Sequence, residues 1–257
     1  MSLLLTKILI GLLVGGLVGF TGIGGGVLLL PLLIFGLGVS PIMAVGSDAV
    51  FNAVTKVGSG YMHWRQGSVN WRLVGALIGG SAPGAIAGVG LLAYVRSVYG
   101  SGVNDFLRTV TGLLLVIIPL LLLFQGRMAT KESRDTDSER RFPLRVVALG
   151  LFAGFLVGMT SIGSGSVTMM LLLLMYPFAP AVMVGTDIVH AVVLTTVTSA
   201  LHFRLGTVNM PLVGALLIGS IPGGIIGTRL ASYVPSYWLR RILCGVLFVT
   251  GARMLLV

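Results

Sequence analysis

Charged residues are scarce in this sequence. Only 9% of its 257 residues are Asp, Glu, Lys or Arg, whereas soluble domains average about 25%. Hydrophobic residues make up 56% of the chain, and the mean hydropathy is +1.04. A single soluble core cannot bury this much apolar surface, so the sequence predicts a membrane protein whose solvent is the bilayer.

Cysteine and clustered histidine are also lacking. The single cysteine, Cys244, lies in an apolar run, which excludes an intramolecular disulfide and a cysteine metal cluster. The three histidines, at positions 63, 190 and 202, are too scattered for a metal site. The glycines of residues 22–26 lack the spacing and βαβ context of a dinucleotide fingerprint. We therefore expect neither a metal nor a cofactor.

The formal net charge is +10, but the basic residues lie in loops between apolar runs. They form no basic face with interleaved aromatics, so nucleic-acid binding is not expected. The lipid bilayer is the expected partner of such a chain, and the sequence leaves the oligomeric state open. The one long polar segment, residues 125–145, mixes six basic and four acidic side chains, and the positive-inside rule predicts that it is cytoplasmic.

The chain contains an internal repeat. Residues 11–88 align without a gap to residues 150–227, at an offset of 139, and 34 of the 78 aligned positions are identical. The motif Val45-Gly-Ser-Asp48 returns as Val184-Gly-Thr-Asp187, and His63-x-Arg-x-Gly-x-Val-Asn70 returns as residues 202–209. Such a run of polar identities predicts two homologous units, residues 1–124 and 146–257, joined by the linker 125–145.

Each unit reads as five apolar segments. They span roughly 4–20, 27–38, 42–62, 70–94 and 106–124 in the first unit, and 144–159, 167–178, 181–201, 210–231 and 237–256 in the second. Crossing about 30 Å of hydrocarbon takes about 20 helical residues. The first two segments of each unit are shorter than this, especially the second. We expect an all-α polytopic membrane protein in which each unit has a hairpin of short broken helices followed by three spans.

Two orientations of the units remain open. If each hairpin spans twice or turns back, each unit crosses an odd number of times, and the units are inverted with both termini outside. If each hairpin is one broken span, the repeats are parallel. The two arrangements place equal numbers of basic residues inside, so charge does not decide between them. Residues 4–38 are too long for one span, and broken helices are typical of inverted repeats, so we expect inverted repeats.

Two of the seven acidic residues, Asp48 and Asp187, occupy the same position of the two units inside long apolar segments. A charge there costs about 2.5–3.5 kcal/mol on insertion scales, and such residues are functional candidates. We expect them to orient a substrate site or to exchange protons. The equally weighted alternative is that each carboxylate caps a helix start or accepts backbone N–H groups at the break.

Asn52 and Lys56 follow Asp48 at helical spacing, so the third segment carries a polar stripe. The second unit has Ala191 and Thr195 at these positions and adds His190. Lys56 is expected either to attract an anion into a cavity or to form a structural pair with Asp48.

A glycine-rich break separates the first two segments of each unit: Gly22-Ile-Gly-Gly-Gly26 and Ser161-Ile-Gly-Ser-Gly165. A helix that starts after such a break offers unpaired N–H groups to an anion, and neighbouring hydroxyls add donors. The alternative is that the small residues only allow close helix packing.

The break Gly-[Phe/Met]-Thr-x-Ile-Gly-x-Gly, the Val-Gly-[Ser/Thr]-Asp segment and the His-x-Arg-x-Gly-x-Val-Asn turn resemble those of the TauE/SafE sulfite exporter family. The resemblance covers nearly the whole chain apart from the linker. It implies a plasma-membrane permease for sulfite, sulfonates or a related oxyanion, and not an enzyme. An intramembrane enzyme, a scaffold or a carrier of another organic anion are the alternatives.

We expect this small anionic substrate to bind between the two units. The units would move against each other and expose the site alternately to the two sides of the membrane. The predicted substrate-binding residues are Thr21, Gly22, Gly24, Gly25, Gly26, Asn52, Lys56, Thr160, Ser161, Gly163, Ser164, Gly165 and His190, with Asp48 and Asp187 in the orienting or proton-exchanging role.

Overall fold

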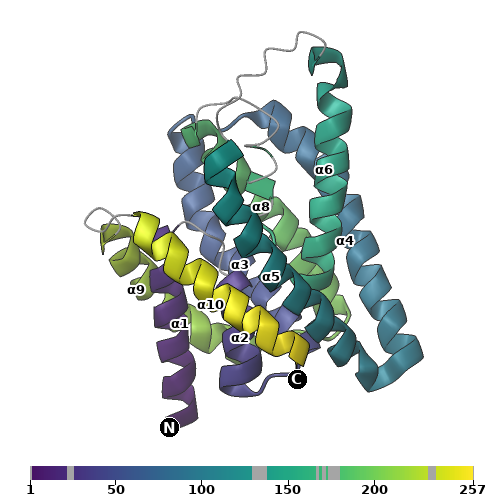
Figure 1. The fold of residues 1–257 in the computed structure, drawn as a ribbon, viewed down its shortest axis with the longest axis vertical. Helices are drawn as coiled ribbons and strands as arrows, with labels where there is room; N and C mark the ends of the chain where they lie inside the picture. Colours follow the sequence, from purple (N-terminus) through teal and green to yellow (C-terminus); the bar gives the residue numbers. More distant parts are fainter. Residues whose placement is uncertain are drawn as a thin grey trace.

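The computed structural model describes residues 2–21, 26–128, 138–165, 168–169, 172, 180–230 and 236–256. Every regular element in these ranges is a helix (Figure 1). The helices are α1 (Ser2–Thr21), α2 (Gly26–Pro31), the π-helical turn η1 (Leu32–Gly36), α3 (Pro41–Arg65), α4 (Trp71–Tyr99), the 3-10 turn η2 (Gly100–Gly102), α5 (Val103–Met128), α6 (Ser138–Thr160), α8 (Pro180–Arg204), α9 (Met210–Leu230) and α10 (Ser236–Leu256).

Three described stretches are long and apolar enough to cross a membrane: Trp71–Leu120, Val182–Arg204 and Met210–Gly227. Shorter apolar helices accompany them. The prediction of an all-α membrane protein is thus confirmed, and the helices fall on the apolar segments read from the sequence. Most of the predicted segment 167–178 lies outside the described residues.

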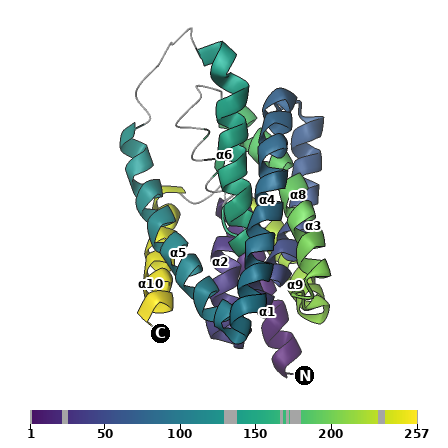
Figure 2. The same cartoon turned by 90° about the vertical axis from the view of Figure 1, so that its right-hand side faces the viewer.

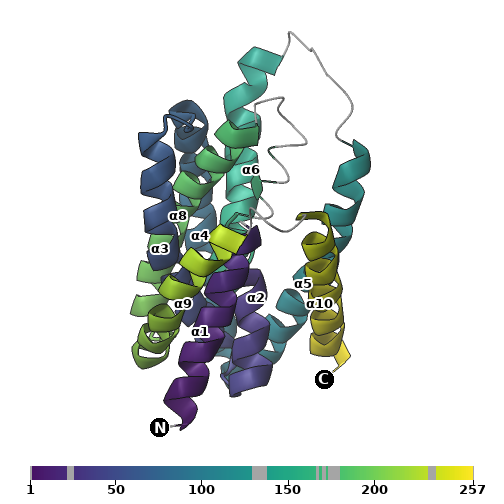
Figure 3. The ribbon, with the colours of Figure 1, turned by 90° about the vertical axis from the view of Figure 1, so that its left-hand side faces the viewer.

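The first hairpin consists of α1 and the short run of α2 and η1. Residues 26–36 rise only about 17 Å as a helix, well below the ~30 Å of a hydrocarbon core. In Figure 3, α1 and α2 lie side by side in the lower half of the molecule. The second arm of the hairpin is therefore too short to span a membrane.

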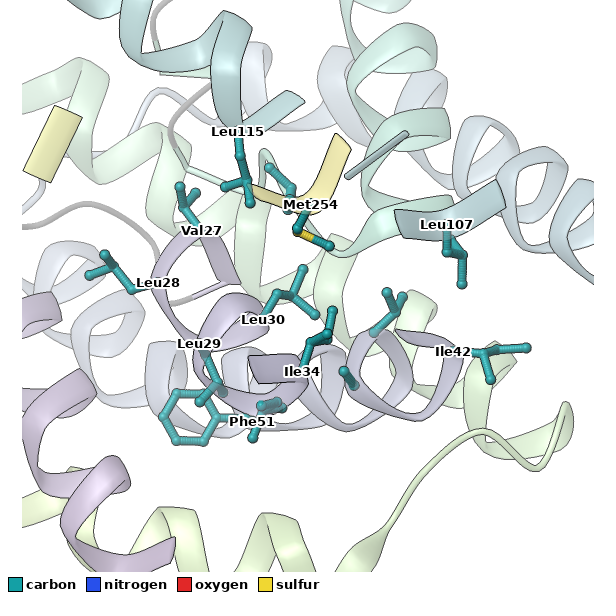
Figure 4. Packing of buried hydrophobic residues seen from close by; sticks show 14 of the residues in the cluster. Val27, Leu28, Leu29, Leu30, Ile34, Ile42, Phe51, Leu107, Leu115 and Met254 are labelled. Carbon is teal, nitrogen blue, oxygen red and sulfur yellow. The ribbon is translucent and has the colours of Figure 1, made fainter. Parts of the chain in front are cut away.

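The second arm of the hairpin, α2, is embedded in protein. Residues 26–31 of α2 are all buried, in a cluster that draws on α3, α5 and α10. Figure 4 shows the side chain of Leu29 beside Phe51, and those of Val27 and Leu30 on the side of Leu115 and Met254. This environment separates α2 from lipid, so that backbone groups at its ends meet protein.

The helices of the two units pair in a reciprocal way. α1 packs along α9 and α6 packs along α4, while α3 contacts α8 and α5 contacts α10. Figure 2 shows α5 and α10 together at one side of the bundle. In the sequence repeat, α1 corresponds to α6 and α4 corresponds to α9. The α1–α9 and α6–α4 contacts are therefore the same contact with the two units exchanged.

Glycines allow the α4–α6 and α1–α9 pairs to approach closely. A Cβ atom added to Gly80 would collide with the backbone of Val147 and Leu151, and one added at the repeat position, Gly219, would collide with the backbone of Ile8 and Leu12. Close backbone packing through small residues is typical of helices in membranes.

Both chain ends lie at the same end of the molecule. The ends of α5 and α6 that flank the linker lie at the opposite end (Figures 2 and 3). The first unit therefore begins at one end of the bundle and finishes at the other.

Candidate functional site

The polar stripe of the first unit lies in the interior of α3. This helix begins at Pro41, with Ser40 as its N-cap residue, so Asp48 is in the third turn and caps nothing. Asp48 is fully buried, and neither of its carboxylate oxygens has a hydrogen-bond partner among the described residues. In the part of the chain that the structure describes, Asp48 therefore neither caps a helix start nor accepts a backbone N–H group, contrary to the capping alternative.

Asn52, one turn further along α3, is also fully buried. Its side-chain Nδ2 donates to the backbone oxygen of Asp48 over 3.0 Å, and its Oδ1 has no partner. The face shared by Asp48 and Asn52, expected from helical spacing, thus leaves three side-chain oxygens unpaired inside the protein.

The second unit contributes Asp187 and His190 from α8. Asp187 lies within the helix that begins at Pro180, as Asp48 does in α3, and its Oδ1 atom is buried without a partner. His190 is fully buried, with Nε2 2.9 Å from the Ser81 hydroxyl of α4 and Nδ1 unpaired. The Ser81 contact holds the imidazole ring in one orientation.

The second glycine break is the irregular end of α6. The helix ends at Thr160, and Ser161 adopts a left-handed conformation with φ of 58°. Gly163 and Gly165 have φ of 106° and 122°, values that only glycine adopts readily. The Thr160 hydroxyl donates to Leu156 O over 2.8 Å and accepts from Ile162 N over 3.2 Å, so its single proton is committed to the backbone.

The two units meet where Gly26 starts α2. A Cβ atom at Gly26 would lie 2.6 Å from Asp48 Oδ2, 2.9 Å from the carbonyl oxygen of Ser161 and 3.3 Å from Asn52 Nδ2. Gly26, the described residue of the first break, therefore adjoins both the polar stripe of α3 and the second break. The Ser161 hydroxyl, buried here, has no partner of its own.

Lys56 extends from α3 to the second break. Its ammonium group donates to the backbone oxygen of Ser164 and, over 2.9 Å, to the Ser164 hydroxyl. It also interacts electrostatically with Asp187, Asp48 and His190. A cation from the first unit thus lies against the backbone of the second unit, among the buried polar groups of α3 and α8.

The structure brings together most of the predicted site residues that it describes. Asp48, Asn52, Lys56, Gly26, Ser161, Ser164, Asp187 and His190 converge in this region, while Gly163 and Gly165 shape the backbone beside Ser164. Gly22, Gly24 and Gly25 lie outside the described residues. Thr21 ends α1, and its predicted contact with a substrate stays a prediction.

Sequence reasoning did not find the role of the turns after α3 and α8. Asn70 N-caps α4, and its backbone N–H donates to Thr186 Oγ1 over 3.0 Å. Asn209 N-caps α9 and donates likewise to Ser47 Oγ over 3.0 Å. Each turn therefore contacts the residue that precedes the buried aspartate of the other unit. The matching motifs were visible in the sequence. The sequence did not show that they contact each other across the two units.

His202, near the end of α8, is fully buried. Its Nε2 donates to Gly158 O near the end of α6 over 2.9 Å, and its Nδ1 lies 2.9 Å from Thr207 Oγ1. The imidazole thus holds the last turn of α6, which leads into the second break.

We expect the substitution His202→Phe to destabilise the protein by about 1–3 kcal/mol, because it leaves the buried carbonyl of Gly158 without its donor. The control is His63→Phe at the repeat position, where the ring is partly exposed and contacts only Ser68; its effect should stay within about 0.5 kcal/mol. Thermal unfolding of the purified variants measures both, and equal losses would contradict a special role for His202.

Comparison with known proteins agrees with this architecture. Residues 7–254 match the family described as Sulfite exporter TauE/SafE. The chain is 35% identical to the probable membrane transporter protein YjnA of Bacillus subtilis, over 96% of this chain and 98% of that protein. It is 25% identical to YdhB of the same organism, over 95% and 96%, and 27% identical to the probable membrane transporter protein MJ0441 of Methanocaldococcus jannaschii, over 97% and 94%. No solved structure matches the chain.

Proposed function

Because the chain belongs to the Sulfite exporter TauE/SafE family of membrane transporters, we propose that it carries a small sulfur-containing oxyanion across the plasma membrane. Sulfite and sulfonates are the expected substrates. The observation that carries the proposal is the position of Lys56, whose ammonium group reaches from α3 to Ser164 in the broken backbone of the other unit. An oxyanion that binds between the units would replace Ser164 as the partner of this cation.

The chemistry around Lys56 suits an oxyanion. Charge-assisted hydrogen bonds from an ammonium group to an anionic oxygen are roughly twice as strong as neutral ones. The hydroxyl groups of Ser161 and Ser164 are additional donors next to glycine backbone that an anion can approach. A carrier also needs moderate affinity, and one lysine with neutral donors provides it without trapping the substrate.

The charges of the site point to coupled transport. Asp48, Asp187 and Lys56 together carry one net negative charge when all three are ionised. This charge repels an anion in a buried site, where charges interact strongly. We infer that an anion enters only after a carboxylate is neutralised, by a proton or by another cation, and that this requirement couples anion transport to a cation gradient.

We infer further that the two units are inverted repeats that move against each other. Support comes from the reciprocal contacts between the units, which are of the kind that a two-fold axis generates. Both chain ends lie opposite the ends of α5 and α6 that flank the linker (Figures 2 and 3). This placement fits units that each cross an odd number of times, as inverted repeats do, better than it fits parallel repeats. Inverted repeats with a site at their interface commonly work by alternating access.

Thermal stabilisation of the purified protein tests the substrate class. Sulfite, taurine, other sulfonates, sulfate and acetate are compared at equal ionic strength, because a ligand that binds only the folded state raises Tm by mass action. The ligand with the largest shift is then used in counterflow with liposomes. We expect a sulfur oxyanion to give both the shift and the flux; acetate as the only active ligand would contradict the substrate class, and the absence of any flux would favour an enzyme or a scaffold.

A further inference from the structure

Asp48 is a buried carboxylate without a counter-ion in contact. Among the described residues its two oxygens have no hydrogen-bond partner, and Lys56, the cation that acts on it electrostatically, is hydrogen-bonded to Ser164. Lys56 also interacts more strongly with Asp187 than with Asp48. A buried carboxylate without a cation in contact is very costly, and none of the described residues places a cation against Asp48, so its charge favours a positively charged partner from outside the chain.

Oxygen atoms without partners surround Asp48. Asn52 Oδ1 and the hydroxyl of Ser161 are buried and unpaired, and the side chains of both residues interact with the Asp48 carboxylate. The carbonyl oxygen of Ser161 and Asp48 Oδ2 lie 2.9 Å and 2.6 Å from the point that a Cβ of Gly26 would occupy. The Asp48 carboxylate, the carbonyl oxygen of Ser161 and the amide group of Asn52 therefore pack closely against Gly26, next to the unpaired Asn52 Oδ1 and Ser161 hydroxyl.

This set of oxygens is the ligand chemistry of a hard cation. One carboxylate among neutral oxygens balances a single positive charge, and Lys56 nearby disfavours a divalent ion. The carbonyl end of α6, which runs from Ser138 to Thr160, adds the negative pole of a helix. A proton on Asp48 could satisfy only one of the surrounding acceptors, whereas a metal ion can contact several of them at once.

We propose that Asp48, Asn52 and Ser161 hold a sodium ion beside Gly26, at the junction of α3, α2 and the end of α6. Unwound backbone and the carbonyl ends of broken helices are known to coordinate sodium in secondary transporters. The ion neutralises Asp48, so that Lys56 and Asp187 balance each other and an anion meets no net repulsion. Only this last consequence rests on the proposed transport function; sodium binding itself is measured without any oxyanion.

Sodium binding is tested on the purified full-length protein. Thermal unfolding is followed while NaCl replaces choline chloride at constant ionic strength, with KCl as a second series. The titrations are run at several pH values, because protons compete for Asp48 while Lys56, Asp187 and His190 face the same region. We expect a saturable rise of Tm with sodium that is much smaller with potassium and choline. Stabilisation by acid alone, with no response to sodium at any pH, would overturn the proposal in favour of a proton site.

Variants locate the ion. Asp48→Asn and Ser161→Ala should each weaken sodium binding by about tenfold or more, since removal even of groups that only support a metal ligand commonly has this effect. Gly26→Ala should abolish binding, because its methyl group would lie 2.6 Å from Asp48 Oδ2 and 2.9 Å from the carbonyl oxygen of Ser161 and would displace both oxygens. If Gly26→Ala does not fold, the other two variants still decide the question.

Two substitutions serve as controls. Gly58→Ala lies on α3 with nothing near its Cβ position, and Asp105→Asn removes an exposed acid at the start of α5. Both should keep the sodium affinity of the wild type. Sodium affinity that is unchanged in Asp48→Asn, or lost equally in the controls, would refute the site, whatever the outcome of the oxyanion experiments.

Discussion

Replacing Lys56 with methionine is expected to weaken oxyanion binding by about 30-fold or more. Truncating one partner of a buried, hydrogen-bonded charge pair typically costs 2–5 kcal/mol, and each 1.4 kcal/mol is a factor of about ten. Methionine keeps the length and apolar stem of the side chain but removes the cation that reaches Ser164. The affinity is read from the oxyanion concentration that gives half of the maximal Tm shift, and the transport rate from counterflow in liposomes.

The repeat supplies a matched control for Lys56. Thr195 is at the equivalent position of α8, where its hydroxyl donates within its own helix, to Ala191 O over 2.7 Å and to Val192 O over 3.3 Å. Thr195→Val should therefore leave oxyanion affinity unchanged. Unchanged oxyanion affinity in Lys56→Met would contradict the proposal that Lys56 attracts the anion. Lys56 would then have only a structural role.

Much of the fold could be predicted because the repeat and the apolar segments are local properties of the sequence. The glycine breaks were found in the same way, and the helices begin and end near the predicted bounds. The predicted segment 42–62 begins next to the observed start of α3, where Ser40-Pro41 supplies an N-cap residue followed by proline at the first helical position. This start leaves Asp48 in the interior of the helix, so Asp48 does not cap α3.

The contacts between the units could not be predicted from the sequence. Helical spacing placed Asp48 and Asn52 on one face, but it did not show that Gly26 and Ser161 meet them there. The cross-unit bonds of Asn70 to Thr186 and of Asn209 to Ser47 are likewise separated by more than a hundred residues. Such contacts depend on how two helix pairs cross, and periodicity within one helix carries no information about that crossing.

The reciprocal bonds also limit how the units can move. Each links the turn that caps a helix of one unit to the residue beside the buried aspartate of the other. If the units move against each other as proposed, separation of either turn from the other unit must break its bond, to Thr186 or to Ser47. These two residues directly precede Asp187 and Asp48, so the proposed movement would act next to the buried carboxylates.

The substitution Gly80→Ala is expected to cause a large loss of stability. Its methyl group would collide with the carbonyl oxygen of Val147 and lie 2.7 Å from the backbone N of Leu151, and backbone cannot rotate away as a side chain can. Overpacking of a tight core commonly costs 1–3 kcal/mol, occasionally more, and here the whole α4–α6 contact must widen. We expect a markedly lower Tm, measured by thermal unfolding in detergent, and a lower yield of monodisperse protein.

The neighbouring glycine separates this collision from a change in helix propensity. Gly79→Ala adds the same methyl group to the same helix, where nothing lies within 4 Å, so it should be neutral or stabilising by up to about 1 kcal/mol. Gly219→Ala, the repeat position on α9, should fail as Gly80→Ala does, because its methyl group would collide with the backbone of Ile8 and Leu12. Equal stability of the Gly79 and Gly80 variants would mean that α4 and α6 are not in close backbone contact. A loss of stability in Gly80→Ala without one in Gly219→Ala would mean that the α4–α6 and α1–α9 pairs are not equivalent. That result would contradict the two-fold relation between the units on which the proposed alternating access depends.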